Sequence, residues 1–234
     1  MTYGRPSVAA LLCLSLLFMF GCSKTQDDGS RLAATLGCAP LSGLDAVLDA
    51  PAAQVLLIGG TSEAGLPAFA QAICSAAARG ESVQATVAAG AAPLWLVTQV
   101  AQWSAKGAQI ELTAIAEALD EDRETKQAAL ASRLMAMRST GDRVIALVDA
   151  ESAARQPLGL SGETWSPAGA RLPRDGAVSL LALETGTDQT RAALSPFEDI
   201  PDHGAARAYD GMIEVASSPT GTPAAAPTDA LRGR

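Results

Sequence analysis

Histidine is nearly absent from this chain of 234 residues, which contains only His203, and aromatic residues make up 4%. The scarcity of imidazole leaves few groups that can exchange protons or bind a metal near neutral pH. The formal net charge of -8 argues against nucleic-acid binding and against electrostatic attachment to anionic lipid headgroups. No CxxC, GxxxxGK[ST] or GxGxxG string occurs, so the sequence supports neither a redox or zinc motif nor a phosphate-binding loop.

The amino terminus has the pattern of a signal peptide. Residues 8–20 form an apolar run, interrupted by Ser15 alone, that is too short for a stable membrane span. The GCSK string that follows resembles the lipobox of bacterial lipoproteins, although Met19 and Phe20 stand where such boxes usually carry Leu and a small residue. The resemblance implies that residues 1–21 are removed and that Cys22 is lipidated.

The same resemblance predicts a location in the bacterial cell envelope, facing the periplasm. Ser23, which follows the lipidated cysteine, favours sorting to the outer membrane. Saturated acyl chains such as palmitate, at roughly 0.8 kcal/mol per buried methylene, would hold the protein on the membrane as a lipid anchor. An ordinary cleaved signal peptide, with Cys22 incidental, is the alternative.

The four cysteines support the same compartment. Cys13 leaves with the signal peptide and Cys22 carries the lipid, so Cys38 and Cys74 remain as one pair. Because such a pair can be oxidised in the periplasm, we predict a disulfide between Cys38 and Cys74. Two unlinked thiols are the alternative.

The length that remains suits a single α/β domain. We expect a lipidated tether and lead-in over residues 22–50, the α/β domain over 51–218, and a disordered tail rich in Pro, Ala, Thr and Gly over 219–234.

Strands and helices are predicted to alternate through the domain. Strands are expected within residues 51–60, 79–90, 108–116, 143–152, 177–186 and 209–218. Helices are expected over 67–78, 93–107 and 120–142, with Trp95, Trp103, Leu130, Leu134 and Met137 packed inward. Because several strands are apolar on both faces, the pattern predicts an α/β fold with a mostly parallel central sheet covered by helices on both faces.

Two turns at the carboxyl ends of strands are the candidate pocket, because ligands of parallel α/β sheets bind at that edge. The candidate residues are Gly60, Ser62, Glu63, Asp149, Glu151 and Ser152. Glu63, Asp149 and Glu151 could together bind a cation, although carboxylates in loops are usually just exposed.

A set of short strings, in a fixed order from about residue 53 to about residue 218, resembles a known superfamily. The strings are LIGGTSEAGLPAF, VQATVAA, SRLMAMRSTGDRVIALVDAESA, SLLALETG and YDGMIEV. They are similar to the superfamily of erythromycin esterases, Tiki metalloproteases and ChaN-type haem-binding lipoproteins. In that superfamily the corresponding strings are GExHG, a strand ending in Glu, R..MA followed by VGNxHA, sLxxxxG and fDxvi.

The departures from this pattern fall on the ionisable residues. Gly60 stands in place of the family's Glu, and Ser62 in place of its first His. Ala88 or Ala89 replaces the second-strand Glu, and Ser152 replaces the second His. We therefore expect no catalytic residue at these positions, and we interpret the protein as a pseudoenzyme, a ligand- or partner-binding domain that needs no cofactor.

A rearranged active site is the competing hypothesis. A hydrolase or metal-dependent enzyme could use Glu63, Asp149, Glu151 or His203, and His203 follows Asp202 in a loop that could equally be solvated. Haem would need an axial ligand such as His203 or Tyr209, neither of which falls at the matched turns. A purely structural envelope lipoprotein is a third possibility. The sequence names neither the small ligand nor the envelope protein that it would bind.

Overall fold

The computed structural model describes residues 32, 34–38, 41–60, 62–88, 90–115, 121–138, 142–160, 163–185, 191–194 and 208–216. The strands are β1 (Val55–Gly59), β2 (Val83–Val87), β3 (Ile110–Ala114), β4 (Arg143–Val148), β5 (Leu158–Leu160), β6 (Glu163–Trp165), β7 (Ala177–Thr185), β8 (Arg191–Leu194) and β9 (Gly211–Ala216). The helices are α3 (Leu44–Asp49), α4 (Ser62–Ala78), α5 (Leu94–Ala105), α6 (Arg123–Arg138), α7 (Ala150–Ala153) and α8 (Ala168–Arg171).

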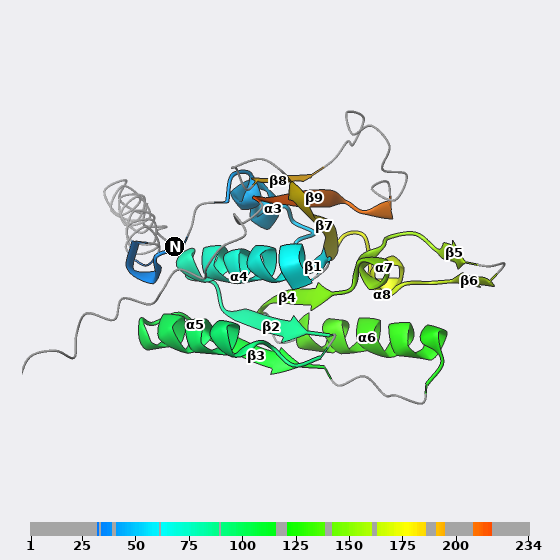
Figure 1. Ribbon diagram of the computed structural model, residues 1–234, viewed down its shortest axis with the longest axis horizontal. Helices are drawn as coiled ribbons and strands as arrows, with labels where there is room; N and C mark the ends of the chain where they lie inside the picture. The colour runs from blue at the N-terminus through cyan, green and yellow to red at the C-terminus, as the bar shows by residue number, and fades with distance from the viewer. Residues whose placement is uncertain are drawn as a thin grey trace, which may run out of the picture.

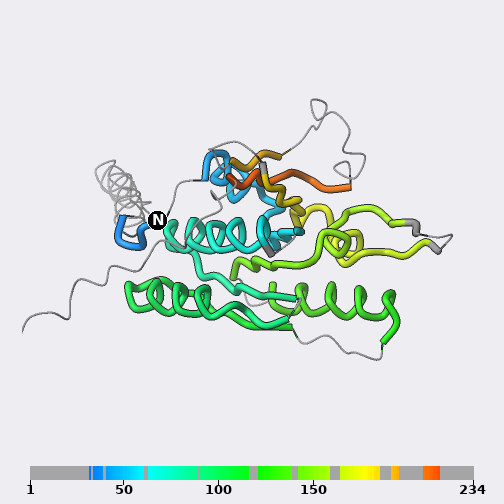
Figure 2. The backbone as a smooth tube through the Cα atoms, viewed as in Figure 1, coloured from blue at the N-terminus to red at the C-terminus, as the bar shows by residue number. Residues whose placement is uncertain are grey.

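Among these residues, seven strands form one sheet in the order β3-β2-β4-β1-β7-β9-β8 (Figure 1). Neighbouring strands are parallel except β8, which runs antiparallel to β9 at the edge. A separate two-stranded hairpin of β5 and β6 extends past the end of the sheet (Figure 2). The predicted fold class, a mostly parallel α/β sheet in one domain, is confirmed.

Side chains of the inner strands alternate between two cores, as strand geometry requires. In β1, Leu56 and Ile58 belong to the core that includes α3, α4 and α5. Val55 and Leu57 point to the other face, where the core includes residues of α6, α7 and α8. Helices therefore cover both faces, and β1 and β4 read as continuous apolar runs because they are buried on both.

The described part of the lead-in packs against the first of these cores. Leu36 and the inward residues of α3 are almost fully buried there. Cys38 and Cys74, the pair expected to be joined, lie at disulfide-bond distance with Cα atoms 5.7 Å apart. The segment before β1 is thus fixed to α4, while Cys22 and the segment up to Ser30 lie outside the described residues.

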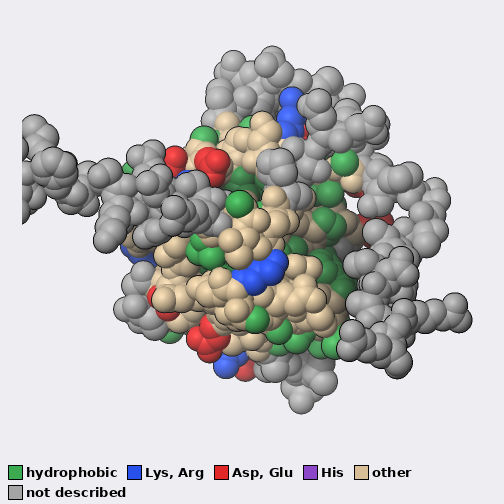
Figure 3. Space-filling view, turned by 90° about the vertical axis from the view of Figure 1, so that its left-hand side faces the viewer, with side chains coloured by type: hydrophobic (Ala, Val, Ile, Leu, Met, Phe, Trp, Pro, Cys, Tyr) green, Lys and Arg blue, Asp and Glu red, His purple; other side chains and the backbone are tan. Residues whose placement is uncertain are grey.

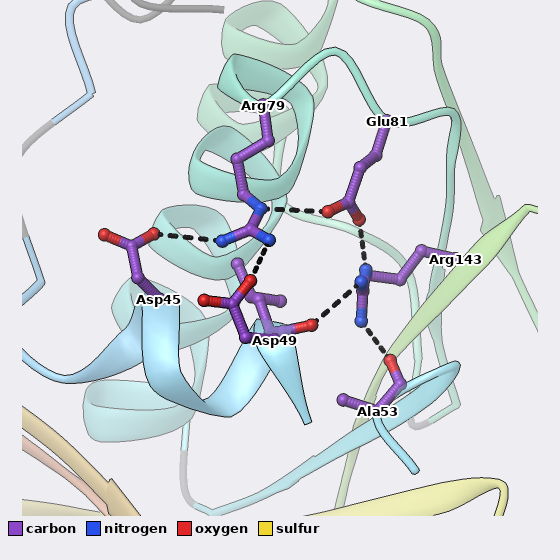
Figure 4. A network of polar contacts seen from close by, with 7 residues as sticks. Asp45, Asp49, Ala53, Arg79, Glu81 and Arg143 are labelled. Atoms are coloured by element: carbon purple, nitrogen blue, oxygen red, sulfur yellow. Dashed lines mark hydrogen bonds and ion pairs between the residues drawn. The ribbon is translucent and has the colours of Figure 1, made fainter. Parts of the chain in front are cut away.

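A chain of ion pairs fixes α3 to the end of α4 and the start of β4 (Figure 4). Arg79, after the last turn of α4, contacts Asp45 and Asp49 of α3 and also Glu81. Glu81 in turn accepts a hydrogen bond from Arg143, which also donates to the carbonyl of Leu48 in α3 and to that of Ala53 before β1. The hydrogen bond from Arg79 to Asp49 raises the pKa of Arg79, so this guanidinium stays charged.

Two expectations about helices are wrong in detail. Helix α4 begins at Ser62 rather than Pro67, and Pro67 lies inside it. The proline removes one backbone donor, but the burial of Ala64 and Ala68 against the sheet offsets that loss. Trp103 is buried as expected, whereas the side chain of Trp95 is exposed.

The exposure of Trp95 follows from helix geometry. Helix α5 buries Leu96, Val100 and Trp103, which are spaced by four and three residues along one face. Trp95 is one residue, about 100° of rotation, away from Leu96 and therefore lies outside that face. Among the described residues, no helix is both long enough and apolar enough to cross a membrane.

Arg155, which follows α7, links the segments behind the second core. Its side chain is almost fully buried and donates to the carbonyls of Gly169, Leu172 and Ala177. It also pairs with Asp210 at 3.0 Å. Burial lowers the pKa of Arg155, because a charged group loses hydration there, and the Asp210 carboxylate partly compensates.

We predict that Arg155→Met destabilises the protein by about 2–3 kcal/mol, because three carbonyls and a carboxylate lose charged hydrogen bonds. Urea unfolding followed by circular dichroism measures the change. Lys106→Ala is the control, because Lys106 is exposed and joins none of the ion pairs among the described residues, so little change is expected. Equal midpoints for the two variants would contradict the prediction.

Candidate functional site

The two predicted turns lie side by side at the carboxyl ends of β1 and β4. These strands pair in parallel register, with Gly59 opposite Val148, and Gly60 donates a hydrogen bond to the Val148 carbonyl at 3.3 Å. A Cβ atom on Gly59 would lie 2.5 Å from the Cβ of Ala153 in α7. The turns therefore converge, but they pack directly against each other and leave no room for a ligand between Gly59 and α7.

A cavity of about 270 Å³ lies on the other side of β4. Its walls come from the carboxyl ends of β2, β3 and β4 and from one face of α6. The lining residues are Ala88, Ile115, Glu121, Lys126, Gln127, Ala129, Leu130, Arg133, Asp149 and Ser152. This is the edge of the sheet at which parallel α/β folds bind ligands, and β2 leads to α5 on one face whereas β4 leads to α7 on the other.

The start of α6 determines which of its residues reach this cavity. The Asp122 carboxylate accepts hydrogen bonds from the backbone N–H and the hydroxyl of Thr125, at 2.9 and 2.8 Å. These bonds lower the pKa of Asp122, and they satisfy a first-turn donor of the helix. The helix then places Lys126, Leu130 and Arg133 along one stripe, at spacings of four and three residues.

The cations in this stripe have no acidic partner among the described residues. Neither Lys126 nor Arg133 belongs to the ion pairs that those residues form. Leu130 packs against the second core and also lines the cavity, so its predicted core role is correct but incomplete. The cavity wall therefore combines cationic and apolar groups, with Glu121 and Asp149 as its carboxylates.

Asp149 and Ser152 are held by capping of α7. Asp149 precedes the helix, and its carboxylate accepts from the Ser152 N–H at 2.7 Å and the Ser152 hydroxyl at 2.6 Å. The same hydroxyl accepts from the Gln127 side-chain amide at 2.8 Å, and Gln127 also accepts from the Ala168 N–H. Ser152 is 2% exposed, so its hydroxyl serves to join α6 to α7.

The remaining predicted residues lie apart from the cavity. Glu63 is exposed in the first turn of α4, and Glu151 is exposed and 3.7 Å from Arg123. The described residues contain no group of three His, Cys, Asp or Glu side chains that could hold a metal ion. The possible cation site of Glu63, Asp149 and Glu151 is therefore not formed: the Asp149 carboxylate caps α7, while Glu63 and Glu151 are exposed.

The other predicted positions lie partly inside and partly outside the described residues. Gly60 is half-buried near Ala182 of β7. Ser62 is the first residue of α4. His203 and Ala89 lie outside the described residues, as does Asp202. Ala88, one of the two positions matched to a missing Glu, lines the cavity.

Sequence reasoning missed Lys126, Gln127 and Arg133. Its expectation for α6 rested on the apolar residues, which mark the inward face. The polar residues beside that face looked like an ordinary solvated surface. One signal in the sequence could have indicated these residues: a stripe of cations borders Leu130 on a helix that precedes a buried strand. Such a helix packs next to the end of the sheet.

A buried hydroxyl without a partner lies next to Ala88 on the same face of β2. Thr86 is fully buried, and its hydroxyl forms no hydrogen bond in the described structure. Side chains two residues apart share one face of a strand, so Thr86 and Ala88 both point toward the α6 side. An unsatisfied buried hydroxyl is unfavourable and frequently marks the place of a water molecule or a ligand group.

A second cavity of about 360 Å³ opens at the amino ends of the strands, the end that faces the viewer in Figure 3. Charged side chains of both signs are scattered over that end. The arginines that line this cavity are already bound: Arg143 donates to Glu81, and Arg138 donates to Gln54 at 2.6 Å. Although it is larger, this cavity therefore has fewer groups free to recognise a ligand.

The pKa of Tyr209 depends on its burial and on the acids near the cavity. Its hydroxyl donates to the Ala150 carbonyl at 2.6 Å. Burial, followed by the charges of Asp149 and Glu151, raises the pKa of Tyr209 to about 12. The neutral phenol is therefore favoured in the folded protein.

We predict that Tyr209 titrates near pH 12 in the folded protein, as measured by ultraviolet absorbance of a Tyr3→Phe background, because Tyr3 is the other tyrosine. The folded pKa lies above the unfolded value, so the associated stability is complete below about pH 10 and is lost as the pH rises through about 12. Glu151→Gln should lower the pKa of Tyr209. An unchanged pKa in that variant would contradict the assigned cause.

The resemblance to the erythromycin esterase, Tiki and ChaN superfamily can be set beside known proteins. Comparison of the chain with models of protein families, with curated proteins and with solved structures found no match. Membership of that superfamily therefore stays a prediction, and function must be argued from the geometry of this chain.

Proposed function

We propose that this protein is a lipid-anchored envelope protein whose α/β domain binds a small amphipathic anion without altering it. The binding site is the cavity at the carboxyl ends of β2, β3 and β4. The observation that carries the proposal is the pair of cations, Lys126 and Arg133, on either side of the apolar Leu130 in its wall.

The cavity wall favours a ligand with a charged head and a short apolar body. Lys126 and Arg133 have no acidic partner among the described residues, so they can bind a carboxylate at little cost in lost ion pairs. A guanidinium binds a carboxylate through two parallel hydrogen bonds, whereas an ammonium acts as a point charge. Leu130 and Ile115 offer apolar surface, and a volume of about 270 Å³ suits a small molecule.

The hydrogen bonds and the burial of the Ser152 hydroxyl support binding without turnover. A serine nucleophile needs a base that takes its proton and an open path to the substrate. The Ser152 hydroxyl is almost fully buried, donates to the capping carboxylate of Asp149 and accepts from Gln127. Attack by this oxygen would break the contacts that hold α7 in place.

The cellular setting of the proposal comes from the amino-terminal sequence. The apolar run over residues 8–20 and the lipobox-like string at Cys22 support a lipid anchor in the bacterial envelope, with the domain in the periplasm. The ordered strings support a relation to ChaN and Tiki proteins. On that relation, the domain has lost its proton-handling groups but has kept a cavity at the ends of its strands. The negative net charge supports the exclusion of nucleic acid as a partner.

We predict that hexanoate, used as a probe, binds in this cavity and shifts the amide signals of Ala88, Ile115 and Leu130 in nuclear magnetic resonance titrations. Arg133→Ala and Lys126→Ala should each weaken binding by about tenfold, because each removes a charged contact to the carboxylate. Lys106→Ala is the matched control, since Lys106 follows α5 in the other helix layer. Shifts confined to other regions, or equal affinities in all variants, would refute the site.

We also predict that the purified protein hydrolyses p-nitrophenyl butyrate no faster than its Ser152→Ala variant. Circular dichroism of that variant checks that the domain remains folded. Hydrolysis that is abolished by Ser62→Ala or Ser152→Ala would instead support the rearranged hydrolase. Stoichiometric metal in protein purified without a chelator would support the metal-dependent enzyme.

A further inference from the structure

Three large apolar side chains are exposed together at the start of α5. Leu94 is 79% exposed, Trp95 is 49% exposed and Val97 is 44% exposed. The inward face of the same helix buries Leu96, Val100 and Trp103, so these residues are not needed for the core. Among the described residues the other exposed large apolar side chain is Leu194, in β8 at the edge of the sheet. The start of α5 is therefore an apolar surface that no described part of the chain covers.

The surroundings of this surface are almost uncharged. Residues 82–110 contain one charged side chain, Lys106, in a chain of which 18% of residues are charged. Glu111 follows in β3, but Ile110 and Leu112 on either side of it pack toward the α5 core, so Glu111 points to the opposite face. The segment 82–110 therefore carries no negative charge that would repel an anionic bilayer, and the exposed Asp45 and Asp49 of the same layer lie in α3.

The route of the chain brings this surface within reach of a membrane. Leu36 and helices α3, α4 and α5 contribute to the same core, and the pairing of Cys38 with Cys74 fixes the entering chain to α4. Fourteen residues separate Leu36 from Cys22, a reach of at most about 50 Å. A lipid at Cys22 would therefore keep the α5 layer near a bilayer without by itself determining its orientation.

We propose that Leu94, Trp95 and Val97 rest in the interface of the lipid bilayer and orient the anchored domain. This inference depends on the lipid anchor in the proposed function. Tryptophan is enriched at membrane interfaces because its ring is apolar and its N–H is polar, and an uncharged apolar surface gains from leaving water. The cavity wall formed by α6 belongs to the opposite helix layer, so this orientation points it away from the membrane.

The fluorescence of Trp95 measures whether this surface contacts lipid. The full-length protein is purified in detergent and reconstituted into vesicles of phosphatidylethanolamine with a minority of phosphatidylglycerol, with or without bromine on the acyl chains near the headgroup. Trp103 and Trp165 are buried and give the unquenched background. We expect brominated lipid to quench tryptophan fluorescence, and we expect this quenching to be lost in Trp95→Phe.

Matched variants test the apolar contact itself. The double variant Leu94→Glu with Val97→Glu should lose the lipid-dependent quenching of Trp95, whereas Leu194→Glu, which makes the same kind of change at another exposed apolar position, should keep it. Unchanged circular dichroism shows that these surface variants fold. If quenching survives the double variant, or never occurs, the proposal is overturned.

The outcomes also separate this proposal from the lipid anchor. Palmitate labelling of the protein in cells tests the anchor. Labelled protein without quenching refutes the α5 contact and leaves the anchor, whereas unlabelled protein whose Trp95 is quenched by added vesicles refutes the anchor, and with it the orientation of an anchored domain, but leaves the contact of α5 with lipid. Sedimentation of the full-length protein in detergent as a dimer that the double variant converts to a monomer would mean that a second copy covers this surface, which would also overturn the membrane contact.

Discussion

The close contact between the end of β1 and α7 determines the geometry of the candidate site. A Cβ on Gly59 would collide with Ala153, so a glycine is needed for the two strand tips to touch. Gly60 extends the contact through its hydrogen bond to the Val148 carbonyl. Because this side of β4 is filled, the open space at the carboxyl ends of the strands lies on the other side, between β4, β2 and α6. The turns that the sequence singles out are thus adjacent, yet one of them lines the cavity and the other supports it.

The polar groups on the two ends of the sheet are used differently. At the amino ends, Arg79 and Arg143 are joined to carboxylates and carbonyls, so their charge stabilises the attachment of α3 and β4. At the carboxyl ends, Asp149 is bound by Ser152, while Lys126 and Arg133 form no ion pair with the described residues. Lys126 is half-buried there, and a cation that has lost hydration gains from an anionic partner. The carboxyl end is therefore the better place for an anionic ligand, although its cavity is the smaller of the two.

The sequence predicts the layers of the fold better than the details of the site. Runs such as that of β4 are apolar throughout, and only burial on both faces explains them. The antiparallel β8 was not predicted because it is short and carries exposed residues, and α3 was missed because six residues give too little periodicity. Lys126 and Arg133 could not be recognised because a cation on a helix is usually solvated. Only the packing of α6 across the ends of β2 and β4 turns that stripe into a cavity wall.

Helices α5 and α6, from the two layers, differ in the charge of their exposed positions, although packing alone does not require such a difference. Helix α6 carries charged residues in its exposed positions, including Arg123 and Arg133, as expected of a helix with one face in water. Helix α5 is exposed to a similar extent but contains no charged residue, and its first turns expose Leu94 and Trp95. Neighbouring exposed apolar side chains of this kind mark sites at which a protein contacts a partner or a membrane. A domain held against a bilayer on its α5 side would have a different solvent on each side, which matches an uncharged, partly apolar α5 in one layer and an α6 with exposed charges in the other.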